Sequence, residues 1–237
     1  MAGGSAGTLL LFGGTGVIAG AIRDLFKSQG WRVVSTARRP PEGAGDDWVA
    51  FDPFAEGFDH ACLDGRGPFS AVVWAQGANR NDSVYDLDVD AHLDLYRANV
   101  LFNLVSLKLM LDRGLLAPAS RLCVISSIWQ NLARQKKLSY CVTKSALQGF
   151  VLSASADLAE DGHVINAILP GALDTPMTRA NLQPAQIAAI AGATKFGRLP
   201  QLDDVANLAL FLCGPGNTGI TGQFIAADLG FSHVRIV

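Results

Sequence analysis

Short runs of consecutive apolar residues alternate along this chain with stretches of helical periodicity. The apolar runs predict strands at 8–12, 31–37, 48–51, 70–76, 121–127, 163–169 and 223–228. The periodic stretches predict helices at about 17–29, 89–113, 139–160 and 203–213. Strands that are apolar at consecutive positions need cover on both faces. The pattern therefore predicts an α/β fold, a doubly wound sheet of seven parallel strands with helices on both faces.

Composition narrows the class of protein. Hydrophobic residues make up 49% of the 237 residues and charged residues 17%, which is apolar for a monomer and predicts surface covered by identical subunits. A net charge of −2 offers no general attraction for nucleic acid or acidic membranes, and no apolar run reaches the roughly 20 residues of a membrane span. No histidines or cysteines stand at metal-ligand spacing, so no metal site is predicted.

The start of the chain and its cysteines predict the cellular compartment of the protein. The segment MAGGSAG lacks the basic start and apolar core of a signal peptide, so we expect a flexible tail at 1–7 and a single domain at 8–237. Four scattered cysteines are typical of buried thiols in a reducing compartment. The expected location is the cytoplasm.

Ligands of doubly wound sheets bind beyond the carboxyl ends of the strands. The first strand ends in FGGTGVIAG, where glycines let the backbone approach a pyrophosphate at a helix N-terminus. The second ends in STARRP, with Ala37 where NAD binding would need a carboxylate. Arg38 and Arg39 are either ligands of a 2′-phosphate or solvated residues, and we favour NADP, with NAD as the alternative. Asp52 either accepts a hydrogen bond from adenine or is solvated, and Gly77 lets the chain pass close to a ribose.

The fifth strand and the helix after it carry candidate chemistry. Ser126 and Ser127 end this strand, and Tyr140 and Lys144 lie one helical turn apart on one face of the helix. An ammonium close to a phenol stabilises the phenolate, so we expect a lowered pKa for Tyr140. Such a tyrosine can act as general acid and base for a carbonyl/alcohol pair.

Together these segments resemble the short-chain dehydrogenase/reductase family over nearly the whole chain. Ser127 precedes Tyr140 by thirteen residues, as the family's serine does, and YCVTKSAL is similar to Y-x-A-S-K-x-A-L. RANVLFN resembles the N-V-x-G segment and LPGALDTPM the P-G-x-x-x-T-x-M segment, while GRLPQLDDVANLALFL and ITGQFIAAD resemble the C-terminal third. The chain departs from the family in five ways: Phe12 replaces a threonine, the glycine turn is shifted by one residue from T-G-x-x-x-G-x-G, W-A-Q-G replaces N-N-A-G, D-L-G replaces D-G-G, and the helix between the second and third strands is missing.

The resemblance implies a Rossmann-type fold, assembly as a homotetramer or homodimer, and hydride transfer with Tyr140 as general acid and base. Lys144 would lower the tyrosine pKa and bind the nicotinamide ribose, and Ser127 would polarise the carbonyl. Asn99 would hold a water that links Lys144 to solvent. The implied cofactor contacts are Gly13, Thr15, Gly16, Val17, Ile18, Arg38, Arg39, Asp52, Ala75, Gln76, Gly77, Tyr140, Lys144, Pro170, Gly171, Leu173 and Thr175. The implied substrate contacts are Ser127, Trp129, Gln130 and Tyr140.

We therefore expect NADPH-dependent reduction of a ketone on a small-molecule substrate. The alternative is an NAD(P)-dependent alcohol or sugar dehydrogenase working in the oxidative direction. A non-catalytic nucleotide-sensing regulator ranks last, because such proteins typically lose the Tyr–Lys pair. Arg134, Lys136 and Lys137 in the loop 128–137 either attract an anionic group or are solvated, and 176–198 is expected to form a mobile lid.

Overall fold

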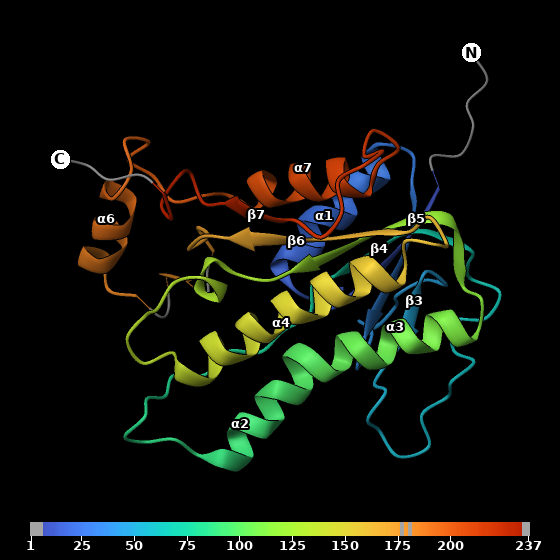
Figure 1. Cartoon of the computed structure of the whole chain (residues 1–237), viewed down its shortest axis with the longest axis horizontal. Coiled ribbons are helices and arrows are strands. Elements are labelled where there is room, and N and C mark those ends of the chain that lie inside the picture. Colours follow the sequence, from blue (N-terminus) through green and yellow to red (C-terminus); the bar gives the residue numbers. More distant parts are fainter. Residues whose placement is uncertain (1–6, 176–177, 180–181, 234–237) are drawn as a thin grey trace.

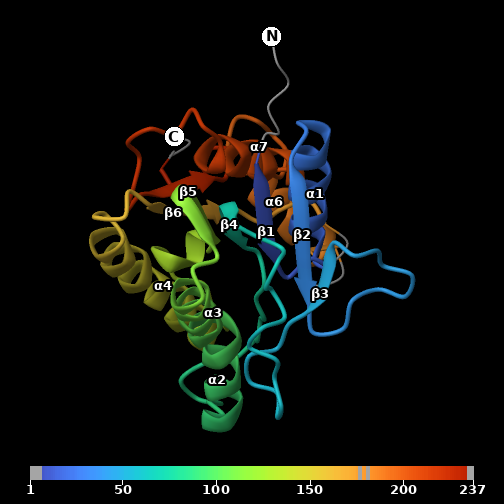
Figure 2. The same ribbon diagram turned by 90° about the vertical axis from the view of Figure 1, so that its right-hand side faces the viewer.

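The computed structural model describes residues 7–175, 178–179 and 182–233, in which seven parallel strands form one sheet between helices (Figures 1 and 2). The strands are β1 (Thr8–Phe12), β2 (Arg32–Ala37), β3 (Trp48–Ala50), β4 (Phe69–Trp74), β5 (Leu116–Ile125), β6 (Val164–Pro170) and β7 (Phe224–Ala227). Their order in the sheet is β3-β2-β1-β4-β5-β6-β7, with every pairing parallel. This confirms the predicted sheet and puts its topological switch point between β1 and β4.

Helices cover both faces of the sheet. They are α1 (Val17–Ser28), α2 (Val89–Tyr96), α3 (Phe102–Asp112), α4 (Leu138–Asp157), α6 (Pro184–Gly192) and α7 (Leu202–Cys213), with a π-helical turn η1 (Arg97–Leu101) and a 3-10 turn η2 (Ile128–Gln130). Figure 1 shows α1 and α7 together on one face and α3 and α4 on the other, with α6 beyond the carboxyl ends of β6 and β7. Residues 38–47 form turns instead of a helix, as their Pro and Gly content predicted.

Alternate positions of β1 supply two separate hydrophobic cores. Leu9 and Leu11 pack toward α1 and α7, whereas Leu10 and Phe12 pack toward α3 and α4. All four are fully buried. Successive side chains of a strand point to opposite faces, so a strand covered on both sides has to be apolar at every position.

The departure at Phe12 has a packing explanation. Its ring centre lies 5.9 Å from that of Trp74, 5.0 Å from that of Phe51 and 5.5 Å from that of Phe102. An aromatic cluster of this kind contributes packing energy beyond the area it buries. The residue before the glycine turn therefore belongs to the core.

The largest differences from the predicted elements concern β5 and the long helix at 89–113. β5 begins at Leu116, before the predicted 121, and ends at Ile125, so that Ser126 and Ser127 lie beyond it. The predicted helix 89–113 is interrupted by η1, a wider turn that contains Asn99. π-helical turns often occur at functional sites, and their wider spacing has no signature in a pattern of apolar residues.

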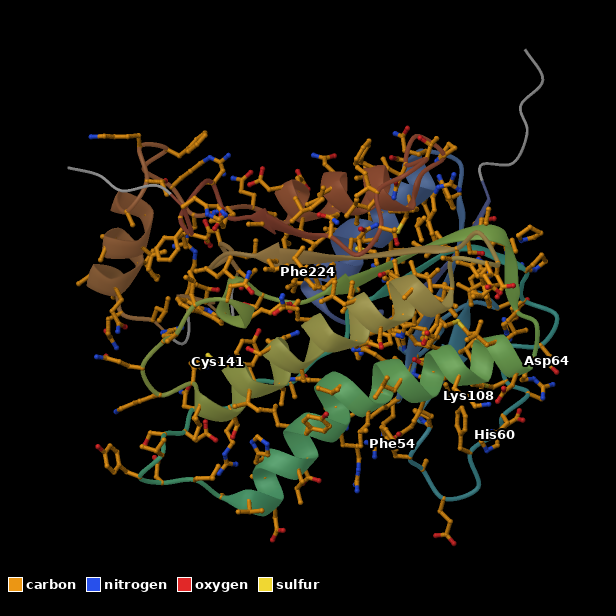
Figure 3. The ribbon with its side chains drawn as sticks, viewed as in Figure 1. Phe54, His60, Asp64, Lys108, Cys141 and Phe224 are labelled. Atoms are coloured by element: carbon orange, nitrogen blue, oxygen red, sulfur yellow. The ribbon has the colours of Figure 1, made fainter. Side chains whose placement is uncertain are left out.

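The segment between β3 and β4 is held to the end of α3. Arg113 pairs with Asp64 through two hydrogen bonds, which lower the pKa of the aspartate, and Figure 3 shows Asp64 at this end of the molecule.

Within the described ranges, every helix is too short or too polar to span a bilayer. The same residues hold no cluster of three or more potential metal-ligating side chains.

Candidate active site

Ser127, Tyr140 and Lys144 meet beyond the carboxyl end of β5. The Ser127 hydroxyl accepts a hydrogen bond from the Trp129 N–H at 3.3 Å, and it lies close enough to the Tyr140 side chain to lower the pKa of that phenol. The Lys144 ammonium lies 5.7 Å from the centre of the Tyr140 ring and donates to the Ile125 carbonyl at 3.1 Å. The i, i+4 spacing on α4 thus brings phenol and ammonium together, with the serine beside them.

Burial controls the acid–base properties of this group. Lys144 is 5% exposed, and burial lowers its pKa from 10.5 to about 8. Burial also raises the pKa of Tyr140, and the hydrogen bond with Ser127 opposes that rise. The expected lowering of the tyrosine pKa by Lys144 is therefore wrong for the protein alone. Burial removes water from the phenol hydroxyl itself and so disfavours the charged phenolate, whereas the Lys144 ammonium lies over the ring.

Asn99 holds two segments of the site together. Its Oδ1 accepts from the Ala78 N–H at 2.7 Å, and its Nδ2 donates to the Ala78 carbonyl at 3.0 Å and to Thr143 Oγ1 at 2.9 Å. Its own carbonyl accepts from Asn103 Nδ2 at 2.9 Å. This amide therefore fixes the backbone after β4 against α4, one residue before Lys144. The water implied at Asn99 stays a prediction.

The loop between β5 and α4 contains a second buried ammonium. Lys137 is 7% exposed and donates to Asn79 Oδ1 at 2.7 Å. It also lies 5.7 Å from the centre of the Tyr140 ring, and burial lowers its pKa. Arg134 lies over the Trp129 ring at 5.8 Å. Lys137 is therefore part of the structure around the tyrosine and is not a solvated loop residue.

The glycine turn after β1 is packed on one side and open on the other. Gly13 has a positive φ of 75°, and an added Cβ would lie 2.6 Å from the backbone N and Cα of Gln76. Gly16 precedes α1, which has neither a side-chain cap nor an acidic residue in its first turn. Thr15, Gly16 and Val17 are exposed. The first N–H groups of α1 are thus accessible to an anion, as a phosphate site requires.

Charged residues follow β2 and β3 at the same carboxyl edge of the sheet. Arg38 and Arg39 are exposed and form no ion pair or side-chain hydrogen bond with any other described residue. Asp52 is half-buried, and its Oδ1 accepts from the Phe54 N–H at 3.2 Å. Both arginines are therefore able to bind a phosphate, and one carboxylate oxygen of Asp52 caps its own turn.

A family model described as enoyl-(acyl carrier protein) reductase matches residues 67–232. This chain belongs to the short-chain dehydrogenase/reductase family. The 3-oxoacyl-[acyl-carrier-protein] reductase of Pseudomonas aeruginosa is 29% identical over 160 residues, which cover 67% of this chain and 64% of that protein. An uncharacterized oxidoreductase of Bacillus subtilis is 26% identical over 164 residues, or 69% of this chain and 67% of that one. The chain therefore matches about two thirds of the length of these relatives.

Solved structures support the fold of this short-chain dehydrogenase/reductase. A putative gluconate dehydrogenase from Agrobacterium tumefaciens superposes with a TM-score of 0.85 at 21% identity, covering 97% of both chains. ElxO with NADP bound superposes with a TM-score of 0.81 at 19% identity, covering 95% of this chain and 98% of that one. The family match and the named relatives, rather than these structures, show that the chain is an oxidoreductase of the short-chain type.

The W-A-Q-G segment builds a polar network of its own in this short-chain dehydrogenase/reductase. Trp74 Nε1 donates to Ser106 Oγ at 2.8 Å, and Gln76 Nε2 donates to Asn103 Oδ1 at 2.6 Å. Asn103 in turn bonds to the Asn99 carbonyl. Side chains of η1 and α3 therefore replace the family's asparagines in fixing this segment. Asn103 follows Asn99 at i+4, a spacing that could have revealed the pair in the sequence.

The segment after β6 is held by its own contacts. The N–H of Gly171 donates to the Ala227 carbonyl at 3.1 Å, and an added Cβ would lie 2.9 Å from Asp228 Cβ. Thr175 Oγ1 accepts from the Thr178 N–H at 3.2 Å. Packing against β7 therefore explains this glycine without a ligand. Contacts of Pro170, Leu173 and Thr175 with a nicotinamide stay predictions, and residues 176–177 and 180–181 of the expected lid lie outside the described residues.

A cavity next to Ser127, whose neighbours Ile128 and Trp129 line it, is closed by α6 and by residues 228–231. Its wall consists of Ile128, Trp129, Gly171, Ala172, Ile190, Thr194, Arg198, Leu199, Pro200, Asp228 and Phe231. The expectation for Gln130 needs correction, because this residue is 6% exposed and accepts from Ser126 Oγ at 2.8 Å. Its carbonyl accepts from Ser145 Oγ at 2.8 Å. Gln130 supports the loop from inside, whereas Trp129 faces the cavity.

Replacing Gly13 by Ala should strongly destabilise the fold. The positive φ costs about 1–2 kcal/mol, and the contact with the Gln76 backbone adds about 1–3 kcal/mol. Gly30→Ala is the matched control, because Gly30 has a φ of 79° with open space around its Cβ position. Urea unfolding should show a loss for Gly13→Ala at least about twice that for Gly30→Ala. Equal losses would mean that Gln76 moves aside freely.

Proposed function

We propose that this chain is an NADPH-dependent reductase of a small ketone or aldehyde. The observation that carries the proposal is the meeting of Ser127, Tyr140 and Lys144 at the carboxyl end of β5, beside an apolar cavity. The 3-oxoacyl reductase and a diacetyl reductase of Staphylococcus aureus, 38% identical over 101 residues, are named as reductases, which supports this direction. The oxidative alternative would use the same residues.

Each residue of the site has a separate task in this proposal. The bound NADPH supplies the hydride. Ser127 donates a hydrogen bond to the carbonyl oxygen and polarises it, and Tyr140 gives that oxygen its proton. A raised pKa keeps the phenol protonated at neutral pH, as a general acid in the reductive direction must be. Lys144 then holds a positive charge beside the phenolate that forms.

We infer that a dinucleotide lies across the carboxyl ends of the strands, from α1 to α4. The uncapped N-terminus of α1 offers N–H groups for a pyrophosphate, with Thr15, Gly16, Val17 and Ile18 around it. Ala37 removes the negative charge that would repel a 2′-phosphate, and Arg38 and Arg39 supply positive charge. Ala75, Gln76 and Gly77 border the ribose side. These features support NADP, and NAD stays the alternative.

Replacing both Arg38 and Arg39 by Ala should reverse the cofactor preference. Each guanidinium contributes a charge-assisted bond to a phosphate, so the Kd for NADPH should rise on the order of tenfold per arginine, and that for NADH should hardly change. Fluorescence titration measures both constants. Lys27→Ala/Lys108→Ala removes two exposed charges elsewhere and controls for net charge. A parallel loss for both cofactors would contradict the 2′-phosphate assignment.

The function itself is tested by following NADPH oxidation with a panel of ketones and aldehydes. Turnover with at least one carbonyl compound supports a reductase, whereas turnover with alcohols and NAD(P)+ alone supports the oxidative alternative. If the protein binds NADPH but oxidises it with no compound, the nucleotide-sensing regulator becomes the better interpretation.

The surface and the segment 176–198 support two further parts of the proposal. Exposed apolar side chains gather on α2, α3 and α4, among them Leu93, Leu104 and Leu152. This surface supports assembly of identical subunits, as a homodimer or homotetramer. The described part of 176–198 includes α6, which borders the cavity through Ile190. A lid that opens to admit substrate is therefore our proposal for this segment.

A further inference from the structure

The cavity next to the catalytic residues contains one polar group without a protein partner. Thr194 follows α6 by two residues and is 5% exposed, yet its Oγ1 forms no hydrogen bond with any described residue. A buried hydroxyl without a partner is unfavourable, because it has lost its hydrogen bonds to water. Such a group in a cavity wall points to a partner that arrives with the ligand.

The other polar groups of this wall already have partners. The Asp228 carboxylate accepts from the N–H groups of Gly230 at 2.9 Å and Ser232 at 2.8 Å. The Arg198 guanidinium donates to the Leu199 carbonyl at 3.1 Å and also pairs with Asp204. Both bonds of Arg198 use Nη1, and its side chain is 45% exposed, so this guanidinium faces solvent. The hydroxyl of Thr194 is the buried polar group of the wall that lacks a partner among the described residues.

The rest of the wall is apolar and rigidly packed. Ile128 is 2% exposed, and the rings of Trp129 and Phe231 meet edge to face with centres 6.4 Å apart. The space between them is small, about 20 Å³, close to the room of one water molecule. A substrate can therefore enter only if the segment around α6 shifts, and it must then be compact.

The position of the cavity links it to the reacting carbonyl. Its wall begins with Ile128, directly after Ser127, which lies beside Tyr140. On the other side it is closed by Gly171 and Ala172, directly after β6. The body of a carbonyl compound held at Ser127 and Tyr140 would extend past Trp129 toward Thr194.

We propose that Thr194 determines specificity for compact carbonyl compounds that carry a second oxygen on an otherwise apolar body. This inference rests on the proposed reductase function and names the substrate class of the same site. The second oxygen, a hydroxyl or carbonyl, exchanges a hydrogen bond with Thr194 Oγ1.

The test compares ketones that differ only at the second oxygen. Hydroxyacetone and butanone form one pair, and α-hydroxyacetophenone and propiophenone form another, each exchanging a hydroxyl for a methyl group. We expect the kcat/KM ratio of hydroxyketone to plain ketone to fall about tenfold or more in Thr194→Val, and to be retained in Thr194→Ser. Comparing ratios between variants cancels the intrinsic reactivity of each ketone.

A second measurement keeps the result separate from the proposed function. The unfolding temperature of the NADP+-bound protein is measured with and without each hydroxyketone. Thr194→Val should unfold at no lower temperature than the wild type, because it removes an unpaired buried hydroxyl.

Stabilisation by hydroxyketone that is lost in Thr194→Val, without any turnover, would retain the site and overturn the reductase. Turnover with ratios equal in all three proteins would retain the reductase and overturn the role of Thr194, whose hydroxyl would then bind only a trapped water. If the hydroxyketones give no turnover and no stabilisation, both the reductase function and the role of Thr194 are overturned.

Discussion

Replacing Tyr140 by Phe is expected to lower kcat/KM for carbonyl reduction by about 10²–10⁴-fold, while the Kd for NADPH stays within about twofold. The change removes only the hydroxyl that lies beside Ser127 and keeps the ring against which Lys137 and Lys144 lie. The protein should therefore fold and bind cofactor but lack the proton donor. Stopped-flow NADPH oxidation and fluorescence titration measure the two effects separately.

Tyr85→Phe is the matched control for this experiment. Tyr85 is 96% exposed, so the same loss of a hydroxyl there should change neither rate nor binding. An active Tyr140→Phe protein would remove the tyrosine from the mechanism. An inactive Tyr140→Phe protein that also fails to bind NADPH would assign Tyr140 to cofactor binding instead.

Replacing Lys144 by Met is expected to stabilise the protein alone while abolishing its activity. Burial lowers the lysine pKa from 10.5 to about 8, and this difference corresponds to about 3 kcal/mol of unfavourable burial below pH 8. Loss of the bond to the Ile125 carbonyl offsets about 1 kcal/mol of that gain. Urea unfolding at pH 7 without cofactor should therefore show Lys144→Met to be more stable by about 2 kcal/mol.

The pH dependence gives this prediction a sign that can be checked. Between pH 8 and pH 10.5 the unfolded chain holds the Lys144 proton and the folded chain does not, so the wild-type free energy of unfolding rises with pH. Lys144→Met lacks this rise, and its advantage should shrink across the same range. Lys108→Met, at an exposed lysine of α3, should leave the pH dependence unchanged (Figure 3). A less stable Lys144→Met protein with wild-type pH dependence would mean that Lys144 stabilises the fold.

The Tyr140 and Lys144 predictions describe one site, in which the groups needed for function lower the stability of the fold. Two ammonium groups and a phenol are withdrawn from water around Tyr140, where apolar side chains would pack at lower cost. Strain and unpaired polar groups in natural proteins often gather at such sites. The unpaired hydroxyl of Thr194 fits the same pattern.

The local pattern of residues was enough to predict the parallel sheet and the shared helix face of Tyr140 and Lys144. Each of these depends on neighbours close in the chain: consecutive apolar residues for a covered strand, and i, i+4 spacing for a helix face. The missing helix between β2 and β3 could be predicted for the same reason, because Pro and Gly act locally.

Burial and long-range contacts decided the rest. The pKa of Tyr140 moves in the direction opposite to the expected one, because desolvation depends on how much protein surrounds the phenol and not on its spacing from Lys144. Asn99 is committed to Ala78 and Thr143, 21 and 44 residues away, through a π-helical turn that apolar periodicity does not reveal. Thr194 becomes a candidate for specificity only when α6 and the end of the chain close around it. The pKa of Tyr140, the hydrogen bonds of Asn99 and the cavity at Thr194 all depend on distances in space, which sequence spacing does not encode.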